Sequence, residues 1–288
     1  MEEIAPGIFI ETGYPPYNLA LVAVDDCGIA IDFPPRPSHA HQWLKEAQAV
    51  VGQLRYVVIT NASPERQVAA ALCKIPIIAA EATLRTIAAQ DERTWRELLQ
   101  DVASLYPEEA VEIMALSPHR VTIAFNRCFM MHHRTPPLTL ETVEGAEPGS
   151  LWLTVPGHHL LFAGDTVAVD EPPPLERTAD SKAWLNSLGH LMKRSKIYQI
   201  VPGRGKAPIL RGDVEQQREF LRVMRRTART LAHKRHNNVN YTQPAQDLGQ
   251  VFFNQSGQKA VKRIRHGLER LVLEIQPPTI EDSPETTL

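Results

Sequence analysis

Polar and charged side chains crowd one short turn of the sequence, TNASPER at residues 60–66. The turn offers the amide of Asn61, the hydroxyl of Ser63, the carboxylate of Glu65 and the guanidinium of Arg66. The preceding run RYVVIT is typical of a buried strand, and the following run PERQVAAAL is typical of a helix. Because a helix that follows a strand presents free backbone N–H groups, such turns often form ligand sites in α/β folds. This turn is therefore the first candidate for a functional site.

Ser63 and Pro64 also have a structural interpretation. A serine hydroxyl can accept a hydrogen bond from the first turn of a helix, and proline suits the first helical position, where no N–H is needed. We therefore predict that Ser63 caps a helix that begins at Pro64.

Two β-rich blocks, each followed by alternating helices and strands, position this turn. The first has predicted strands in GIFIET, NLALVAV and GIAIDF, then a helix in RPSHAHQWLKEAQAVV, the strand RYVVIT, a strand and helix in IPIIAAEATLRTI, and a mostly helical stretch at 91–115. The second, from residue 119, has predicted strands in RVTIAF, CFMMHH, LTLETVEG, SLWLTVP and HLLFAGDTV, a helix in SKAWLNSLGHLMK and a strand in IYQIVPG. This repeated order predicts an α+β fold of two similar halves, with two sheets packed together and helices outside.

Residues 211–275 are predicted to form a C-terminal helical extension to a main domain at residues 1–210. Apolar residues recur there at helical spacing on two faces, Val214, Leu221, Met224, Ala228 and Leu231 on one, and Ala260, Val261, Ile264, Leu268, Leu271 and Val272 on the other. The extension holds 13 Lys and Arg against 6 Asp and Glu. Residues 276–288, QPPTIEDSPETTL, lack apolar periodicity, so we expect a flexible acidic tail.

The composition is that of an ordinary globular protein. The 288 residues are 43% hydrophobic and 22% charged, with a net charge of −2. Cys27, Cys73 and Cys128 are odd in number and far apart, so we expect them to be reduced and buried, which favours a cytoplasmic location. The N-terminus lacks the pattern of a signal peptide, and no run is apolar enough to span a membrane.

Three segments, in this order and spacing, resemble the metallo-β-lactamase-like hydrolase superfamily. They are GIAIDFPP with RYVVITNASPERQVAAAL, then VEGAEPGSLWLTVPGHHLLFAGDTV, and finally IYQIVPGRG. The resemblance covers roughly residues 4–210. It implies a four-layered αβ/βα sandwich with its site at the edge between the two central sheets. Members of that superfamily usually bind one or two zinc or iron ions there and hydrolyse, or otherwise transform, a substrate.

The metal ligands of the superfamily are mostly absent at the matching positions. Its motif T-H-x-H-x-D-H corresponds to residues 60–66, which contain no histidine. The histidine of its G-H-x-P-G-S turn is replaced by Ala146, and the histidine of P-G-H-G by Arg204. Asp165, in AGDTV, is the one residue that matches a ligand, while Asp32, in AIDF, matches a position that is usually structural.

These residues do not provide a catalytic zinc site. Such a site needs about three protein ligands and an open position for water. Asn61 and Ser63 are weak neutral donors, and the guanidiniums of Arg66 and Arg204 cannot be deprotonated to become ligands. We therefore expect no metal, no other cofactor and no catalytic residue.

The replacements also make sense as charges. If the folds correspond, Arg66 and Arg204 lie where the metal ions would lie, facing Asp165 and Glu65. Guanidinium–carboxylate pairs are geometrically specific and would hold the two halves together. Their net stabilisation would be small, because desolvation of the charges offsets much of their attraction.

Several alternatives stay open. Histidines could rebuild a metal site, the candidates being His39 with His41, His119, His132 with His133, and His158 with His159, although neighbouring residues in a strand point to opposite faces. Ser63 could be a nucleophile, or Glu65 and Asp165 an acid–base pair, without metal. A pocket with two arginines could also bind a small anion, helped by the N–H groups near Pro64.

The basic extension has two interpretations. A nucleic-acid interface would need aromatic side chains on the basic face, and these are nearly absent, so we favour a solvated face. The apolar faces would then dock on the main domain or on a second copy, forming a homodimer. Tyr241, Phe252 and Phe253 are expected in a loop or short turn as packing anchors.

The leading hypothesis is a metallo-β-lactamase-like protein that has lost most metal ligands and acts as a non-catalytic binding or structural protein. Its candidate pocket residues are Asn61, Ser63, Glu65, Arg66, Asp165 and Arg204. The rigid connector DEPPPLERTAD, just after Asp165, is expected to overhang that pocket. The second hypothesis is an active hydrolase with an atypical metal site or a metal-free mechanism, and the third is a nucleic-acid binder acting through residues 211–275.

Overall fold

A computed structural model describes residues 1–25, 27–132, 137–233, 240–254 and 257–276. The expected flexible tail, apart from Gln276, lies outside the described residues.

The strands and helices follow the predicted order, except that the strand at Glu2–Ala5 and the helix at Thr242–Phe253 were not predicted. The strands are β1 (Glu2–Ala5), β2 (Ile8–Tyr14), β3 (Tyr17–Val24), β4 (Cys27–Ile31), β5 (Gln53–Val58), β6 (Ile77–Ala80), β7 (Val121–Phe125), β8 (Cys128–Met131), β9 (Leu138–Thr142), β10 (Leu151–Val155), β11 (Leu160–Ala168) and β12 (Gln199–Arg204). The helices are α1 (Pro37–Val51), α2 (Pro64–Cys73), α3 (Glu81–Ala88), α4 (Glu92–Ala103), α5 (Ala110–Met114), α6 (Ser181–Lys193), α7 (Arg211–Ala232), α8 (Thr242–Phe253) and α9 (Gln258–Ile275). Two short 3-10 helices lie at Pro107–Glu109 and Pro156–His158.

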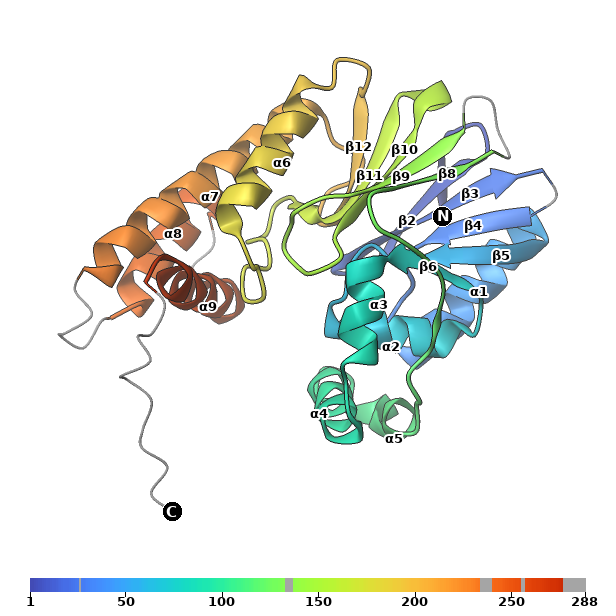
Figure 1. Ribbon diagram of the computed structural model, residues 1–288, viewed down its shortest axis with the longest axis horizontal. Helices are drawn as coiled ribbons and strands as arrows, with labels where there is room; N and C mark the ends of the chain where they lie inside the picture. The colour runs from blue at the N-terminus through green and yellow to red at the C-terminus, as the bar shows by residue number, and fades with distance from the viewer. Residues whose placement is uncertain (26, 133–136, 234–239, 255–256, 277–288) are drawn as a thin grey trace.

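The strands form one continuous sheet that consists of two halves. The order is β7-β6-β5-β4-β3-β12-β11-β10-β9-β8, with β2 also paired to β3 and β1 to β2. One register pair, Tyr17 with Arg204, joins β3 to β12. The two halves therefore meet at a seam that is held by very little backbone pairing (Figure 1).

Apolar side chains fill the space between the two half-sheets and the space under the helices. Ile8, Val22 and Phe162 belong to the core between the halves. Helices α1 and α2 cover the outer face of the first half around Trp43, and α6 and α7 cover the second half around Trp184. The sequence of layers is helix, sheet, sheet, helix, so the predicted four-layered α+β sandwich is confirmed.

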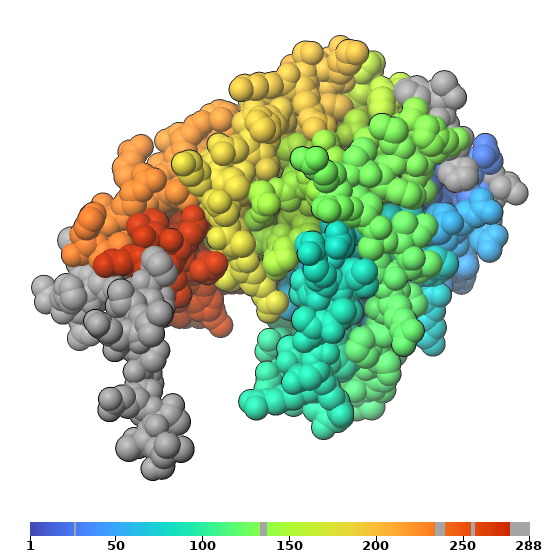
Figure 2. Space-filling model, viewed as in Figure 1, coloured from blue at the N-terminus to red at the C-terminus, as the bar shows by residue number. Residues whose placement is uncertain are grey.

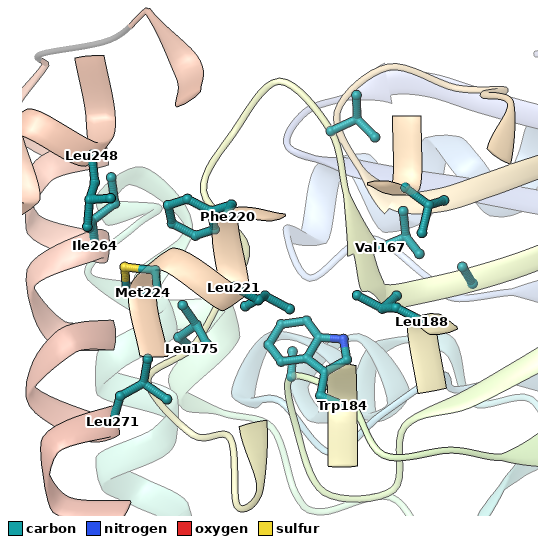
Figure 3. Close-up of a cluster of buried hydrophobic side chains, with 14 of the residues drawn as sticks. Val167, Leu175, Trp184, Leu188, Phe220, Leu221, Met224, Leu248, Ile264 and Leu271 are labelled. Carbon is teal, nitrogen blue, oxygen red and sulfur yellow. The ribbon is translucent and has the colours of Figure 1, made fainter. Parts of the chain in front are cut away.

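The C-terminal helices share a core with the second half of the sheet. The predicted apolar face of α7 is buried, and Phe220, Leu221 and Met224 pack between Trp184 and Leu271 of α9 (Figure 3). Hydrogen bonds also tie α7 to β11: the side-chain amide of Gln217 accepts from the N–H of Ala168 at 2.9 Å and donates to the carbonyl of Thr166 at 3.0 Å. The apolar stripes therefore dock on this chain's own main domain.

Two expectations from the sequence are wrong in detail. Phe252 and Phe253 end helix α8 rather than lying in a loop, although they are packing anchors, with ring centroids 5.3 Å and 5.0 Å from that of Phe220. Cys128 is exposed at the start of β8, the last strand in the order of the sheet, whereas Cys27 and Cys73 are buried. Within the described part of the chain, no helix is long and apolar enough to cross a membrane.

Candidate functional site

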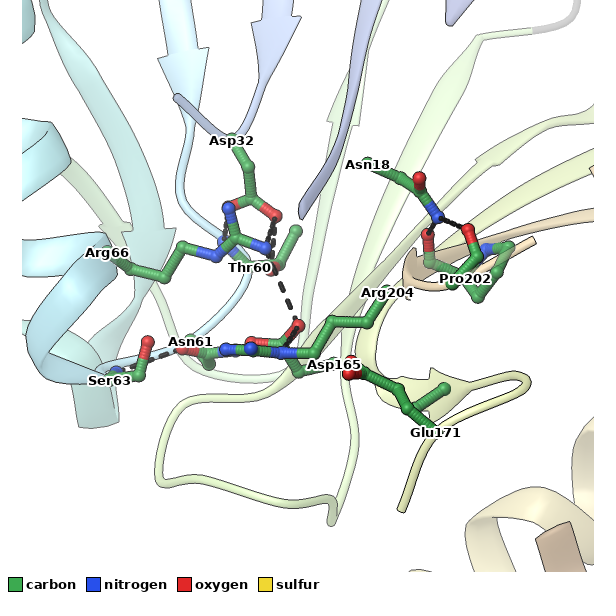
Figure 4. A network of polar contacts seen from close by, with 12 residues as sticks. Asn18, Asp32, Thr60, Asn61, Ser63, Arg66, Asp165, Glu171, Pro202 and Arg204 are labelled. Atoms are coloured by element: carbon green, nitrogen blue, oxygen red, sulfur yellow. Dashed lines mark hydrogen bonds and ion pairs between the residues drawn. The ribbon is translucent and has the colours of Figure 1, made fainter. Parts of the chain in front are cut away.

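The candidate site lies at the seam between the two half-sheets. Asp32 follows β4 and Thr60 follows β5, and these parallel strands bring their carboxyl ends together. Asp165 on β11 and Arg204 at the end of parallel β12 approach from the second half. Arg66 reaches the same point from the first turn of α2. Five side chains from both halves thus converge in one buried centre (Figure 4).

Asp165 is the hub of this centre. Its Oδ1 accepts from Nε of Arg204 at 3.1 Å and lies 3.5 Å from Nη2 of Arg66, and its Oδ2 accepts from Nδ2 of Asn61 at 3.0 Å. Burial raises the pKa of the Asp165 carboxyl, but the charges of Arg204 and Arg66 outweigh it and hold that pKa well below its usual range. Asp165 is therefore an anion whose two oxygens are both occupied by donors.

Arg66 links this hub to a second carboxylate. Its Nη2 lies 3.2 Å from Oδ2 of Asp32, which also accepts from Oγ1 of Thr60 at 2.7 Å, while Oδ1 of Asp32 accepts from the N–H of Thr60 at 3.0 Å. Burial, and then the charge of Asp165, raise the pKa of Asp32, and Arg66 opposes them. Nε and Nη1 of Arg66 are buried without a hydrogen-bond partner among the described residues.

Tyr17 packs under both guanidiniums. Its ring centroid lies 5.0 Å from Cζ of Arg66 and 4.8 Å from Cζ of Arg204. Such cation–π contacts favour a cation in a site where water is excluded. Desolvation penalises both arginines, but the neighbouring carboxylates raise the pKa of each above its usual value. The two cations are therefore permanent, each held between carboxylate and aromatic ring.

The turn that carries Arg204 brings the backbone of β12 close to Asp165. Nδ2 of Asn18 donates to the carbonyls of Pro202 and Gly205, at 3.0 Å and 2.9 Å, and so ties the turn to β3. A Cβ atom at Gly203 would lie 2.5 Å from Oδ1 of Asp165. Only glycine therefore lets the backbone of β12 pass Asp165 closely enough for the Arg204 contact.

Ser63 does not play the predicted capping role. It occupies the N-cap position of α2 in an extended conformation, but its side chain makes no capping hydrogen bond. Its own N–H donates to Oδ1 of Asn61 at 2.9 Å, so Asn61 orders this turn. The buried Oγ of Ser63 has no hydrogen-bond partner among the described residues. No described residue is therefore placed to act as the base that would activate this hydroxyl for nucleophilic attack. The prediction of a Ser63 cap is wrong, because the hydroxyl of Ser63 accepts no hydrogen bond from the first turn of α2.

We expect S63A not to lower the free energy of unfolding, since no bond of the hydroxyl is lost and a buried polar group without a partner is removed. The matched control is Asp91, which caps α4 through a 2.7 Å bond from the N–H of Thr94 to its Oδ1. D91A should cost about 1 kcal/mol. Urea denaturation of both variants checks this, and equal losses would restore the capping role of Ser63.

A cavity of about 280 Å³ opens in front of the centre. Asp165 and Arg204 form its floor together with Ser63, and Glu65 and Glu147 add carboxylates. Glu65 forms no ion pair with either arginine in the described contacts, where the partners are Asp32 and Asp165. Its negative charge still helps to raise the pKa of Arg204.

Segments far apart in the sequence form the walls of this cavity. Asp101 and Leu105 contribute from α4 and its C-terminal end, Arg263 from α9, and Pro174 and Arg177 from the connector after β11. Figure 2 shows the hollow in the molecular surface between α4 and the C-terminal helices. The connector DEPPPLERTAD therefore borders the cavity, as the sequence predicted. A larger cavity of about 570 Å³ lies on the other side of the 145–150 turn.

The described residues do not fit a catalytic metal. They contain no group of three or more His, Cys, Asp or Glu side chains placed to hold an ion. The histidines considered as substitutes are apart from the centre: His39 packs on Tyr14, His41 lies 3.9 Å from Glu112, and His119 and His159 contact backbone carbonyls. His133 lies outside the described residues.

No protein-family profile and no curated protein sequence matches this chain. Solved structures match it well. A stereoselective inverting sec-alkylsulfatase from Pseudomonas sp. has a TM-score of 0.68 and 12% identity, covering 95% of this chain and 50% of that chain. A metallo-β-lactamase family protein from Thermus thermophilus has a TM-score of 0.63 and 17% identity, covering 95% of this chain and 94% of that chain.

A metallo-β-lactamase from Pontibacter korlensis has a TM-score of 0.57 and 14% identity, covering 77% of this chain and 97% of that chain. This chain spans about half the length of the alkylsulfatases that it matches. At these identities the likeness concerns the fold. The chain has the metallo-β-lactamase-like fold, as its sequence segments indicated.

Some residues of the site were missed from the sequence. Asp32 was assigned a structural position, yet it is an ion-pair partner of the centre. Tyr17 gave no signal, because the first residue of an apolar strand is not distinguished by spacing. Glu147 was visible in the turn GAEPGS, next to Ala146, but only the structure places its carboxylate in the cavity wall.

Proposed function

We propose that this chain is a non-catalytic binding protein on a metallo-β-lactamase-like fold, in which an arginine–aspartate network stands where the superfamily holds its metal ions. The observation that carries the proposal is the environment of Asp165. Its carboxylate is the one superfamily ligand present, and two guanidiniums and an amide occupy both of its oxygens. A metal ion at Asp165 would have to displace cations that are themselves buried and paired.

The cavity in front of the network supports binding rather than a purely structural role. An ion pair with a purely structural role could be covered completely by other side chains. Here Asp165, Arg204 and Ser63 instead border a cavity that opens to solvent. The ligand suggested by the sequence is a small anion at an arginine-containing pocket. The guanidinium of Arg204 is only partly available to an anion, because its Nε already donates to Asp165.

A nucleic-acid partner at the C-terminal helices is disfavoured. Arg218 and Arg222 pair with Glu215 on α7, Arg225 pairs with Glu274, and Arg263 pairs with Glu171. These pairs reduce the positive field that nucleic-acid binding requires. A homodimer through residues 211–275 and a cytoplasmic location stay predictions.

Metal content and activity test the proposal together. We expect substoichiometric zinc and iron in protein purified without chelators, and no rise in melting temperature on addition of zinc, because binding to the folded state alone would raise it. Hydrolysis of ester, β-lactam, thioester, phosphodiester and alkyl sulfate substrates should stay at the rate of the uncatalysed reaction.

The last substrate belongs in the panel because an alkylsulfatase is among the structural neighbours. Stoichiometric metal together with turnover that chelators abolish would overturn the proposal in favour of a metallohydrolase. Turnover without metal, lost in S63A or D165N, would favour a metal-free hydrolase instead.

A further inference from the structure

The charges that line the 280 Å³ cavity are not those of an anion site. Asp165 and Arg204 neutralise each other across its floor. Arg263 is held by Glu171 at 3.3 Å, by Glu176 at 3.9 Å and by the carbonyl of Pro172 at 3.2 Å. Once these pairs are set aside, the carboxylates of Glu65, Asp101 and Glu147 face one remaining cation, Arg177.

A buried polar atom without a partner marks the same cavity as a ligand site. Ser63 is 3% exposed and lines the cavity, yet its Oγ makes no hydrogen bond within the described structure. A buried hydroxyl left in this way costs free energy unless something bonds to it. Its oxygen is able to accept a hydrogen bond from an N–H group that enters beside Glu65.

The geometry points to a small organic cation as the ligand: we propose that the cavity binds a primary ammonium group between Glu65 and Glu147, with Oγ of Ser63 as a third acceptor. This proposal rests on the binding function proposed above and names its ligand class. An ammonium group carries three donors and no acceptor, which matches two carboxylates and one hydroxyl oxygen.

An anion fits the cavity less well. The N-terminus of α2 would normally attract an anion, but Pro64 has no N–H and the N–H of Ser63 is bonded to Asn61. Glu65 in the first turn already places a negative charge at the helix end. Arg66, whose free donors would suit an anion, does not line the cavity.

A divalent metal ion also fits less well. Such an ion needs several oxygen ligands within direct coordination distance. The carboxylates of Glu65, Asp101, Glu147 and Glu176 line one cavity, but they form no group close enough to hold a metal ion. An organic cation places its hydrogen-bonding groups farther apart and so reaches separated carboxylates.

The environment of Glu147 makes cation binding depend on pH. Burial first, and then Glu65 on α2, Asp165 on β11 and Glu176 on the connector, raise the pKa of Glu147 to about 8, against the opposing charge of Arg177. Near neutral pH this carboxyl mostly holds a proton, which an incoming ammonium group displaces. Affinity for an amine should therefore rise roughly twentyfold between pH 6.5 and pH 8.5.

The experiment uses the full chain and titrates 1,4-diaminobutane by calorimetry in amine-free buffer, with uncharged 1,4-butanediol as the matched control ligand. We expect saturable binding of the diamine and none of the diol. At pH 8.5, where Glu147 is mostly ionised, E65Q and E147Q should each weaken binding about tenfold, and S63A about two- to fivefold. E144Q is the control variant, because Glu144 is exposed in the neighbouring turn and lines the larger cavity only.

Three results would overturn the inference. One is diamine binding that E65Q leaves unchanged, whatever the effect of E147Q, because Glu147 also lines the larger cavity. Another is equal loss in E144Q, which would place the amine in the larger cavity. The third is binding of phosphate or magnesium, but not the diamine, with loss in E65Q or E147Q. Phosphate binding that is lost in R204M would contradict the cationic ligand but support a binding function with an anionic ligand. Zinc-dependent turnover would contradict the proposed binding function itself.

Discussion

R66M should lower the free energy of unfolding by about 3–5 kcal/mol, the usual cost of removing one partner from a buried ion pair. Arg66 is fully buried and stands between Asp32 and Asp165, at 3.2 Å and 3.5 Å. Methionine fills a similar space but leaves both carboxylates without this cation. The loss arises from the uncompensated buried charges rather than from the net worth of the pairs, which desolvation keeps small.

Restoring electroneutrality should recover much of that loss. The double variant R66M/D32N removes the carboxylate that loses its ion-pair partner, since Asp165 keeps Arg204. Asparagine tolerates the left-handed backbone of Asp32, whose φ is 59°. The control is R85M, because Arg85 forms an exposed pair with Glu81 on α3 and should cost less than about 0.5 kcal/mol. Urea denaturation measures all three. A cost below about 1 kcal/mol for R66M, or no recovery in the double variant, would contradict this account of the centre.

The fold was largely accessible from the sequence because its signals are local. Alternating apolar residues in NLALVAV and RVTIAF, and helical spacing in SKAWLNSLGHLMK, each describe an element by itself. The resemblance then supplied the order of the layers. Helix α8 was missed because TQPAQDLGQVFF has a proline as its third residue and also carries a glycine, so its local preference for a helix is weak and its packing on Phe220 decides the conformation.

The site was accessible only in part because its contacts are not local. Arg66 and Arg204 were placed near Asp165 correctly, since the fold that the sequence segments resemble brings these three backbone positions together. The second carboxylate that pairs with Arg66 was not predicted correctly. Glu65 is adjacent in sequence, but neighbouring side chains on a helix point in different directions. The carboxylate that pairs with Arg66 is that of Asp32, after the end of β4. Tyr17 and Glu147 depend on how the seam and the 145–150 turn close, which no spacing in one chain reveals.

Glu147 should make the protein less stable as the pH rises from about 5 to 8. The folded state raises the pKa of this carboxyl from its ordinary value of 4.5 to about 8, mainly by burial and then through Glu65 and Asp165. Between those two values the folded state binds a proton that the unfolded state has released. The stabilisation is therefore present below pH 4.5 and is lost as the pH rises toward 8. The free energy of unfolding should fall by at most about 1.4 kcal/mol per pH unit in this range.

E147Q should remove this dependence, because glutamine keeps the shape and neutrality of the protonated form. The variant should match the wild type at pH 5 and exceed its free energy of unfolding by about 1–3 kcal/mol at pH 8, a value discounted for the partial exposure of the side chain. Urea denaturation at pH 5, 6.5 and 8 in amine-free buffer measures both proteins beside E144Q, which lacks the burial and should follow the wild type. If the free energy of unfolding changes with pH in the same way for wild type and E147Q, Glu147 is ionised in the folded protein. The cavity would then carry the full negative charge of Glu147 at every pH tested, and its affinity for a cation would not depend on this carboxyl's titration.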